Sequence, residues 1–159
     1  MMNENMNFID VGLKNSEQLL AETHHYIKWQ APLDVEYMSK DTILKLSCEA
    51  MRITVRITQI IGWLTLQKSI LKGEISLEEV RNNKTPILQG ETCLDRKSEM
   101  DPLLPDRLRE LLKKSREFYI HTMKLEEMSL RQPLYPEEIR KKHRPGPRLC
   151  PQRKAKDSG

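Results

Sequence analysis

The sequence predicts an all-α fold, an antiparallel three-helix bundle with a long central helix, and three observations lead to this class. First, residues 39–73 contain no proline, begin after Ser39 and end at Gly73, so one helix of about 50 Å fits them. Second, only 5% of the residues are aromatic and six are glycine, which disfavours a β-sandwich or barrel. Third, charged residues make up 31% of the chain, which suits exposed helix surfaces.

The 159 residues are expected to form one domain with two loose ends. Residues 1–12 lack a clear hydrophobic period and are expected to be a flexible arm. Residues 13–131 hold the periodic segments of the bundle. Residues 132–159 are basic and proline-rich with few large apolar side chains, so we expect a disordered tail.

The first helix is expected to open at Ser16, a candidate N-cap, and to end near Trp29, ahead of Pro32. The central helix follows, with the Ser39 hydroxyl as its N-cap and Gly73 as the left-handed residue that ends it. These two helices precede the connection to the last helix.

Ser76 and Glu79 have the spacing of a capping box, which predicts a short helix ending near residue 83. Residues 84–100 contain a proline and a glycine and are expected to be a long loop. The third helix is expected to start at Pro105 and to end before Pro133. Its predicted buried positions are Leu108, Leu111, Leu112, Ser115, Phe118, Tyr119, Thr122, Leu125 and Met128.

The central helix carries three seams at 3/4 spacing. An aliphatic seam, expected to be buried, consists of Leu46, Ala50, Ile53, Ile57, Ile60, Leu64 and Leu71, with Ile61 beside it. A seam of small residues, which another helix could approach closely, consists of Ser47, Met51, Thr54, Thr58, Gly62, Thr65 and Ser69. A polar seam consists of Glu49, Arg52, Arg56, Gln59, Trp63 and Gln67.

The polar seam has two interpretations. Arg52 and Arg56 lie one turn apart and repel each other unless negative charge is supplied. Glu49 and a neighbouring helix supply it if the seam is an internal network that fixes the register of the bundle. A partner supplies it if the seam is a docking face, with Trp63 as an aromatic anchor.

Composition indicates a reducing, cytoplasmic location without a membrane span. The cysteines Cys48, Cys93 and Cys150 are odd in number and widely spaced, so no disulfide framework is expected. The first residues lack the basic and apolar regions of a signal peptide. The most apolar run, residues 53–71, is interrupted by Arg56 and Lys68, whose burial in lipid would be costly.

The residues do not form a pattern typical of catalysis. The histidines and cysteines are scattered, a glycine-rich phosphate loop is missing, and neighbouring carboxylates such as Glu126 and Glu127 are expected to be solvated. We therefore expect no enzymatic activity, no metal and no cofactor.

The C-terminal end of the chain accounts for its net positive charge. Residues 131–159 hold nine Lys and Arg against three acids, a net charge of +6, whereas the rest of the chain is at −2. The tail could contact nucleic acid, fold onto a partner, or only keep the chain soluble. No aromatic residue follows Tyr135, so base stacking has no platform there. The candidate contact residues are Arg140, Lys141, Lys142, Arg144 and Arg148.

Two blocks of residues resemble the RcdA-like family of alphaproteobacteria, the regulators of CtrA degradation. The first block follows the pattern E-x-x-R-x-T-x-R-[LI]-x-Q, W-L-x-x-Q and G-E, at Glu49, Arg52, Thr54, Arg56, Gln59, Trp63, Leu64, Gln67, Gly73 and Glu74. The second, looser block contains Leu104, Pro105, Ser115, Phe118, Tyr119, Lys124, Leu125 and Glu126. The resemblance covers about residues 16–128, with departures at Thr58, Thr65, Phe118, Lys124 and Glu126.

The resemblance implies a homodimeric three-helix bundle without enzymatic activity. It also implies an adaptor in cell-cycle-linked regulated proteolysis, which helps deliver a CtrA-like response regulator to the ClpXP protease. The implied partners are a ClpX-type unfoldase, co-adaptors and client regulators. The alternative is a nucleic-acid-associated regulator that binds through the basic tail.

Overall fold

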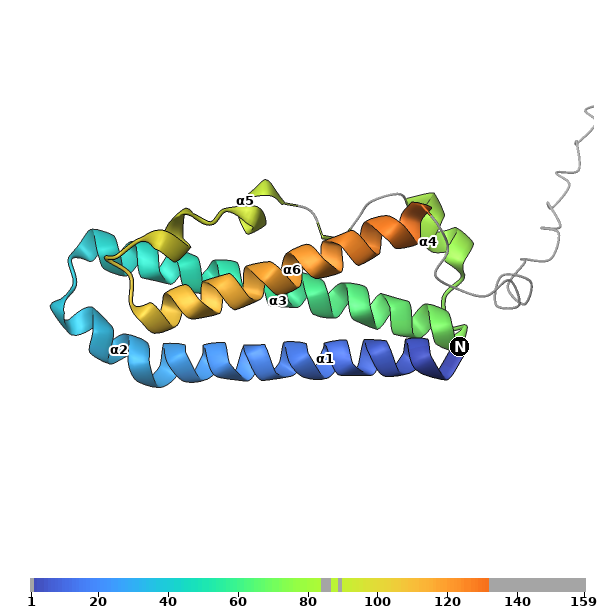
Figure 1. Cartoon of the computed structure of the whole chain (residues 1–159), viewed down its shortest axis with the longest axis horizontal. Coiled ribbons are helices and arrows are strands. Elements are labelled where there is room, and N and C mark those ends of the chain that lie inside the picture. The colour runs from blue at the N-terminus through green and yellow to red at the C-terminus, as the bar shows by residue number, and fades with distance from the viewer. Residues whose placement is uncertain (1, 84–86, 89, 132–159) are drawn as a thin grey trace, which may run out of the picture.

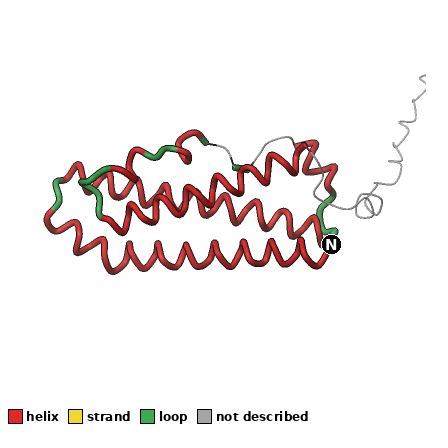
Figure 2. Tube along the Cα trace, viewed as in Figure 1, coloured by secondary structure: helices red, strands yellow, loops and turns green. Residues whose placement is uncertain are grey.

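The computed structural model describes residues 2–83, 87–88 and 90–131. This part of the chain is helical and contains no β-strand, and its long helices are α1 (Met2–His25), α3 (Lys40–Lys72) and α6 (Asp106–Arg131). They lie side by side as a helical bundle (Figure 1), and helical turns fill much of the connections (Figure 2). The predicted all-α class is therefore confirmed, while the expected disordered tail at 132–159 lies outside the described residues.

The long helices do not all alternate in direction. Helix α1 runs against α3, whereas α3 and α6 run the same way (Figure 1). The contacts agree, because Arg56 bonds to Leu112 and Gln59 bonds to Tyr119, further along both helices. A parallel pair requires the chain to return along the bundle, and residues 73–105 make that return. The expected antiparallel arrangement is thus wrong for α3 and α6.

Helix α1 begins at Met2, so the expectation of a flexible arm at residues 1–12 is wrong for the residues that the structure describes. Ile9 is buried in the core, and Gly12 faces the side chain of Leu64 closely enough that a Cβ would lie 3.1 Å from it. Ser16 is not an N-cap but lies inside the helix, where its hydroxyl donates to the Gly12 carbonyl. Packing against α3 overrides the weak helix propensity of the asparagines and the glycine.

The chain continues past the predicted helix end near Trp29 through a wide turn. The π-helical segment η1 (Tyr26–Gln30) is followed directly by α2 (Ala31–Asp34) and the 3₁₀ turn η2 (Val35–Tyr37). The Ala31 N–H bonds to the Tyr26 carbonyl, five residues back. This wider spacing accommodates Pro32, which has no N–H and would crowd a regular helix.

Both predicted ends of the central helix are confirmed. The Ser39 hydroxyl accepts a hydrogen bond from the Thr42 N–H at the start of α3. Gly73 ends α3 with φ at 76°, and its N–H bonds back to Ile70. The predicted aliphatic seam of α3 is buried throughout, with Ile61 half-buried beside it.

The return contains more helix than the loop expected for residues 84–100. Helix α4 (Leu77–Asn83) starts with the predicted capping box, in which Ser76 and Glu79 exchange bonds through their side chains and N–H groups. Helix α5 (Glu91–Leu94) and the turn η3 (Lys97–Met100) follow, while residues 84–86 and 89 lie outside the described part.

The apolar core consists of two clusters that meet near the middle of α3. The cluster towards α2 contains Leu19, Tyr26, Ala31, Leu46, Ile53, Ile57, Leu104, Leu108, Leu111 and Leu112. The cluster towards the other end contains Ile9, Ile60, Trp63, Leu64, Ile70, Leu71, Leu88, Cys93 and Tyr119. On α6 the buried stripe continues through Thr122 to Glu126 and Ser129. The predicted Leu125 is half-buried against the core, whereas the predicted Met128 is exposed.

Replacing Ile9 with alanine tests the packing of the first turns of α1. Because Ile9 is buried, we expect Ile9→Ala to lower the free energy of unfolding by about 2–4 kcal/mol. The exposed Val11 is the matched control, and Val11→Ala should change it by less than about 0.5 kcal/mol. Urea unfolding followed by circular dichroism measures both, and equal small effects would contradict the packed α1.

The left-handed Gly73 gives a second stability test. We expect Gly73→Ala to lower the free energy of unfolding by about 1 kcal/mol, because a Cβ is disfavoured at φ of 76°. Gly73→Asn should cost less, since asparagine tolerates this conformation. The same urea titration compares the two variants, and an Ala cost no larger than the Asn cost would argue against this cap.

Candidate functional site

The polar seam of α3 lies in the interior. Glu49, Arg56, Trp63 and Gln67 are buried, whereas Arg52 and Gln59 are partly exposed. The seam faces α6 and residues 90–101, which we call the crossing segment because they pass alongside both helices (Figure 1). The seam thus has the location that an internal network requires.

Arg56 joins α3, α6 and the crossing segment through four hydrogen bonds. Its Nε donates to the Cys93 carbonyl at 2.7 Å, and one terminal nitrogen donates to the Asp95 carbonyl at 3.2 Å. The other donates to the Leu112 carbonyl at 3.0 Å and to the Ser115 hydroxyl at 3.1 Å. All four acceptors are neutral, and burial lowers the pKa of the guanidinium from its usual value. A fully buried cation is thus stabilised by fixed dipoles.

Glu49 and Arg52 extend the network towards α2. Glu49 Oε1 accepts from the Ser98 hydroxyl at 2.8 Å and lies 3.3 Å from Arg52. Arg52 also pairs with the Asp95 carboxylate at 3.3 Å. The expected repulsion between Arg52 and Arg56 is therefore offset by Glu49 and by the crossing segment. Glu49 Oε2 is buried without a hydrogen-bond partner among the described residues.

Two further ion pairs hold the end of the crossing segment. Arg116 of α6 binds both carboxylate oxygens of Glu99, and one of these bonds measures 3.1 Å. Lys45 of α3 pairs with Asp101. Asp101 also accepts from the Leu103 N–H, so it caps the turn that leads into α6. Charges on both helices therefore fix where α6 begins.

Glu126 anchors the return at the other end of α6. The prediction that its carboxylate is solvated is wrong. It is buried, and its two oxygens accept from the N–H groups of Ile87 and Leu88 at 2.7 and 3.0 Å. One carboxylate thus satisfies two consecutive backbone donors. The sequence signal for this burial is the position of Glu126 four residues after Thr122, on the same face of α6 as the buried Ser115 and Tyr119.

Gln59 and Trp63 lie on the side of the seam near Tyr119. The Tyr119 hydroxyl donates to the Gln59 side chain at 2.6 Å, and Trp63 packs in the core cluster with Tyr119 and Cys93. Trp63 is only 2% exposed, so it does not present an anchor at the surface. Burial, together with the nearby Cys93 thiol, raises the pKa of Tyr119 to about 12.

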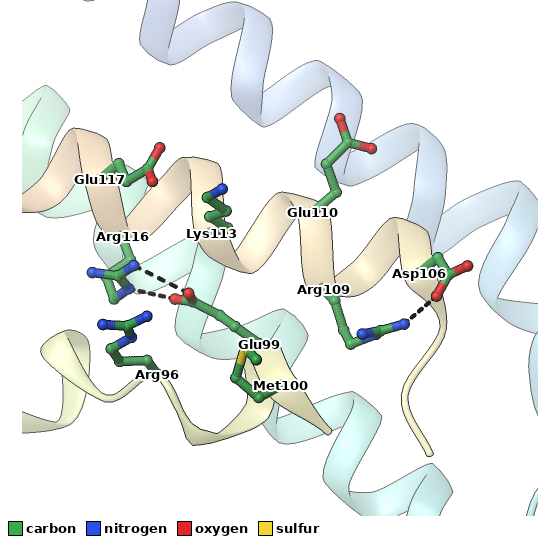
Figure 3. Close-up of a pocket in the computed structure, with 9 residues that line it drawn as sticks. All are labelled: Arg96, Glu99, Met100, Asp106, Arg109, Glu110, Lys113, Arg116 and Glu117. Atoms are coloured by element: carbon green, nitrogen blue, oxygen red, sulfur yellow. Dashed lines mark hydrogen bonds and ion pairs between the residues drawn. The ribbon is translucent and has the colours of Figure 1, made fainter. Parts of the chain in front are cut away.

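The surface beside this network is hollowed between η3 and α6. Figure 3 shows the charged residues that line a hollow of about 540 Å³. Its cations are Arg96, Arg109, Lys113 and Arg116, and its anions are Glu99, Asp106, Glu110 and Glu117. Arg116 pairs with Glu99 and Arg109 with Asp106, while Arg109 Nε is buried without an acceptor in the described part of the chain. The four cations and four anions of the hollow balance in charge.

Metal binding, a membrane span and the tail are three further features predicted from the sequence. Within the residues that the structure describes, no three His, Cys, Asp or Glu side chains gather as a metal site would require. No described helix has the length and apolar character needed to span a bilayer. The candidate tail residues Arg140, Lys141, Lys142, Arg144 and Arg148 lie outside the described part.

Substitution of Arg56 tests its role as the central tie. We expect Arg56→Met to lower the free energy of unfolding by about 3 kcal/mol, because four buried acceptors lose their donor. Arg56→Lys should also destabilise, by about 2 kcal/mol, since one ammonium cannot reach acceptors on two segments. Arg52→Lys is the matched control and should cost less than about 1 kcal/mol. If urea unfolding shows that Arg56→Met lowers the free energy of unfolding by less than about 1 kcal/mol, the role of Arg56 in holding these segments together is contradicted.

The raised pKa of Tyr119 predicts an alkaline loss of stability. The folded chain keeps the phenol proton that the unfolded chain releases above pH 10, so the stabilisation is complete below pH 10 and is lost towards about pH 12. We expect the free energy of unfolding to fall by up to about 1.4 kcal/mol per pH unit in this window from this group. Tyr119→Phe should reduce the slope, and the exposed control Tyr37→Phe should not. If urea titrations give the wild type and Tyr119→Phe the same slope of unfolding free energy with pH, Tyr119 is not the group responsible.

One comparison with known proteins identifies the family of the chain. No curated protein and no solved structure matches it significantly. A family model described as "Protein of unknown function (DUF1465)" matches residues 7–144. The match begins inside α1 and extends beyond α6, so it includes every element of the bundle and of the network around Arg56. Because the match covers most of the sequence, the chain belongs to the DUF1465 family.

Proposed function

We propose that this chain is a non-enzymatic adaptor in cell-cycle-linked regulated proteolysis. In this role it helps deliver a response-regulator client to a ClpXP-type protease, together with co-adaptors. Two arguments support the proposal: the resemblance of α3 and α6 to the RcdA-like pattern, and the display of large apolar side chains at one end of the bundle. The second argument rests on the structure and carries the proposal of a protein-binding role.

The segments η1, α2 and η2 lie near the starts of α3 and α6 at one end of the bundle, which we call the α2 end (Figure 1). Large apolar side chains are exposed on these segments. Each of them is at least 60% exposed: Trp29, Leu33, Tyr37, Leu44, Met100 and Leu103. Single exposed apolar residues are ordinary, but so many on adjoining segments are typical of a protein-binding surface. Trp and Tyr are also the residues that most often dominate binding energies.

The α2 end presents these side chains on a fixed backbone. Ala31 is buried with Tyr26 in the core cluster, and Val35 packs against that cluster. The Tyr26 hydroxyl donates to the Asp34 carboxylate at 3.0 Å, which ties α2 to the start of η1. Because these segments are already ordered, a partner that docks there meets a low ordering cost.

The residues of the RcdA-like pattern have a supporting role in this proposal. Glu49, Arg52 and Arg56 hold the crossing segment, and Gln59 holds Tyr119. The crossing segment in turn carries Met100, and Asp101 caps the turn that displays Leu103. The pattern therefore shapes the α2 end from inside, and the client contacts the exposed side chains.

A nucleic-acid-associated regulator is the second candidate, and the charge of the sequence favours it. Residues 131–159 have a net charge of +6, and phosphate contacts by such a segment weaken steeply as salt is added. This candidate predicts that DNA or RNA binding disappears when the chain ends at Arg131.

The adaptor role is tested by removing the aromatic residues of the α2 end. We expect the wild-type chain to capture a ClpX-type unfoldase or a response regulator from lysate of its native cell. The double variant Trp29→Ser/Tyr37→Ser should lose most of that capture, because both side chains are exposed anchors. Met128→Ser is the matched control, since Met128 is exposed near the far end of α6.

Circular dichroism should show unchanged folding for all three chains, so that a loss of capture reports on docking. Recovery of nucleic acid instead, lost at moderate salt and in a chain ending at Arg131, would reject the adaptor and support the second candidate. Capture of the same proteins by the double variant would show that the client uses another surface.

A further inference from the structure

The charged hollow between η3 and α6 adjoins the apolar surface of the α2 end. Met100 belongs to both, because it lines the hollow and is also one of the exposed apolar side chains of the α2 end. Figure 3 shows Met100 next to Glu99 on the crossing segment, which faces α6 across the hollow. A single partner can therefore contact the apolar surface and the charged hollow at the same time.

Most charges of the hollow are already used within the chain, although their numbers balance. Three of its four carboxylates form ion pairs. These pairs are Glu99 with Arg116, Asp106 with Arg109, and Glu110 with Arg107 and Lys114. The two cations that bind Glu110 do not line the hollow, so they neutralise this carboxylate from outside. The hollow thus contains fewer available negative charges than its composition indicates.

Two cations of the hollow are available to a partner. Arg96 comes from the crossing segment and Lys113 from α6, so they approach the hollow from its two sides (Figure 3). Neither side chain forms an ion pair or a hydrogen bond with any residue that the structure describes. The fourth carboxylate, Glu117, also has no ion pair in this part of the chain. Two positive charges therefore remain against one negative charge.

The hollow is elongated along α6. Its lining on this helix extends from Asp106 to Glu117, a rise of about 16 Å. An extended peptide of about five residues spans that length, whereas a small anion would occupy only a fraction of it. The volume of about 540 Å³ lies within the range of ordinary binding sites. Shape therefore favours a segment of chain over a single ion.

We propose that the hollow binds an acidic segment of the client, extended along α6, while apolar residues beside this segment contact Met100 and the α2 end. This inference rests on the proposed function, and it specifies the chemistry of the partner. A carboxylate between the two sides of the hollow accepts hydrogen bonds from the Arg96 guanidinium and the Lys113 ammonium. The apolar contacts supply affinity, and the charge pairs select an acidic sequence.

Glu117 limits how much negative charge the hollow accepts. It lies one helical turn beyond Lys113 on α6, so it repels an acid that binds there. The other three carboxylates also line the hollow and disfavour a long run of negative charge. The site therefore suits one or two acidic residues among apolar ones, and it disfavours a polyanion such as nucleic acid.

Binding of a defined peptide to the purified full-length chain tests the inference. The probe is a fluorescein-labelled peptide with three leucines followed by two aspartates, and the control peptide carries asparagine in place of both aspartates. We expect fluorescence anisotropy to give the aspartate peptide a dissociation constant about five-fold lower. Added salt should reduce this difference, because the contacts lie at the surface.

Charge substitutions test which residues select the acid. Arg96→Glu and Lys113→Glu should each remove most of the preference for aspartate, whereas Glu117→Gln should increase it. Lys97→Glu and Lys124→Glu are the matched controls, because both lysines are exposed and neither lines the hollow. Each control should leave the preference within about two-fold of the wild type. Circular dichroism checks that all variants fold.

Three results would overturn the inference. One is that neither peptide binds, or that both bind equally. Another is a preference for aspartate that survives Arg96→Glu combined with Lys113→Glu. The third is displacement of the peptide by inorganic phosphate at low millimolar concentration, which would indicate a site for a small anion.

Capture from lysate distinguishes this inference from the adaptor role. If the wild-type chain captures neither an unfoldase nor a response regulator, the adaptor role is contradicted, and the peptide measurements still decide the chemistry of the hollow. If the wild type captures them and Arg96→Glu combined with Lys113→Glu captures them equally well, the adaptor role stands and the acidic segment is contradicted.

Discussion

The buried guanidinium of Arg56 is the interaction on which the arrangement of the chain depends. It is the point where α3, α6 and the crossing segment meet, and its donors satisfy carbonyls on two of these three elements. A planar group with donors fixed in several directions suits this position, whereas a lysine offers a single point of charge. The cation lies where the two apolar clusters adjoin. Its donors need acceptors inside the core, and this requirement fixes the register of α3 against its partners.

The parallel direction of α3 and α6 makes this polar tie necessary. An antiparallel pair needs only a short connection, whereas here residues 73–105 must return along the bundle. The return buries Leu88, Cys93 and Leu104 in the core, and charged groups hold it as well. Glu126 binds its start, Arg56 and Arg52 bind its middle, and Arg116 and Lys45 bind its end. The polar seam thus adds polar contacts to the apolar packing of the return.

The surface is organised differently from the interior. The residues of the RcdA-like pattern lie mainly inside, where they shape the α2 end, whereas most of the large apolar side chains that are at least 60% exposed lie at that end. A division between internal residues that set the shape and external residues that contact partners fits the proposed adaptor. It also explains why a pattern of polar residues can be typical of a family without being a docking face.

The sequence by itself determined the helical class, both ends of α3, the capping box of α4 and the aliphatic seam, because these depend on local spacing and capping chemistry. It also singled out the polar seam, but left open whether that seam is a network or a docking face. Only the tertiary structure decided that α1 begins at Met2, that α6 runs parallel to α3, and that Glu126 is buried. These features depend on contacts between residues far apart in the chain. Neither helix propensity nor hydrophobic spacing shows which carbonyl a buried Arg56 will bind.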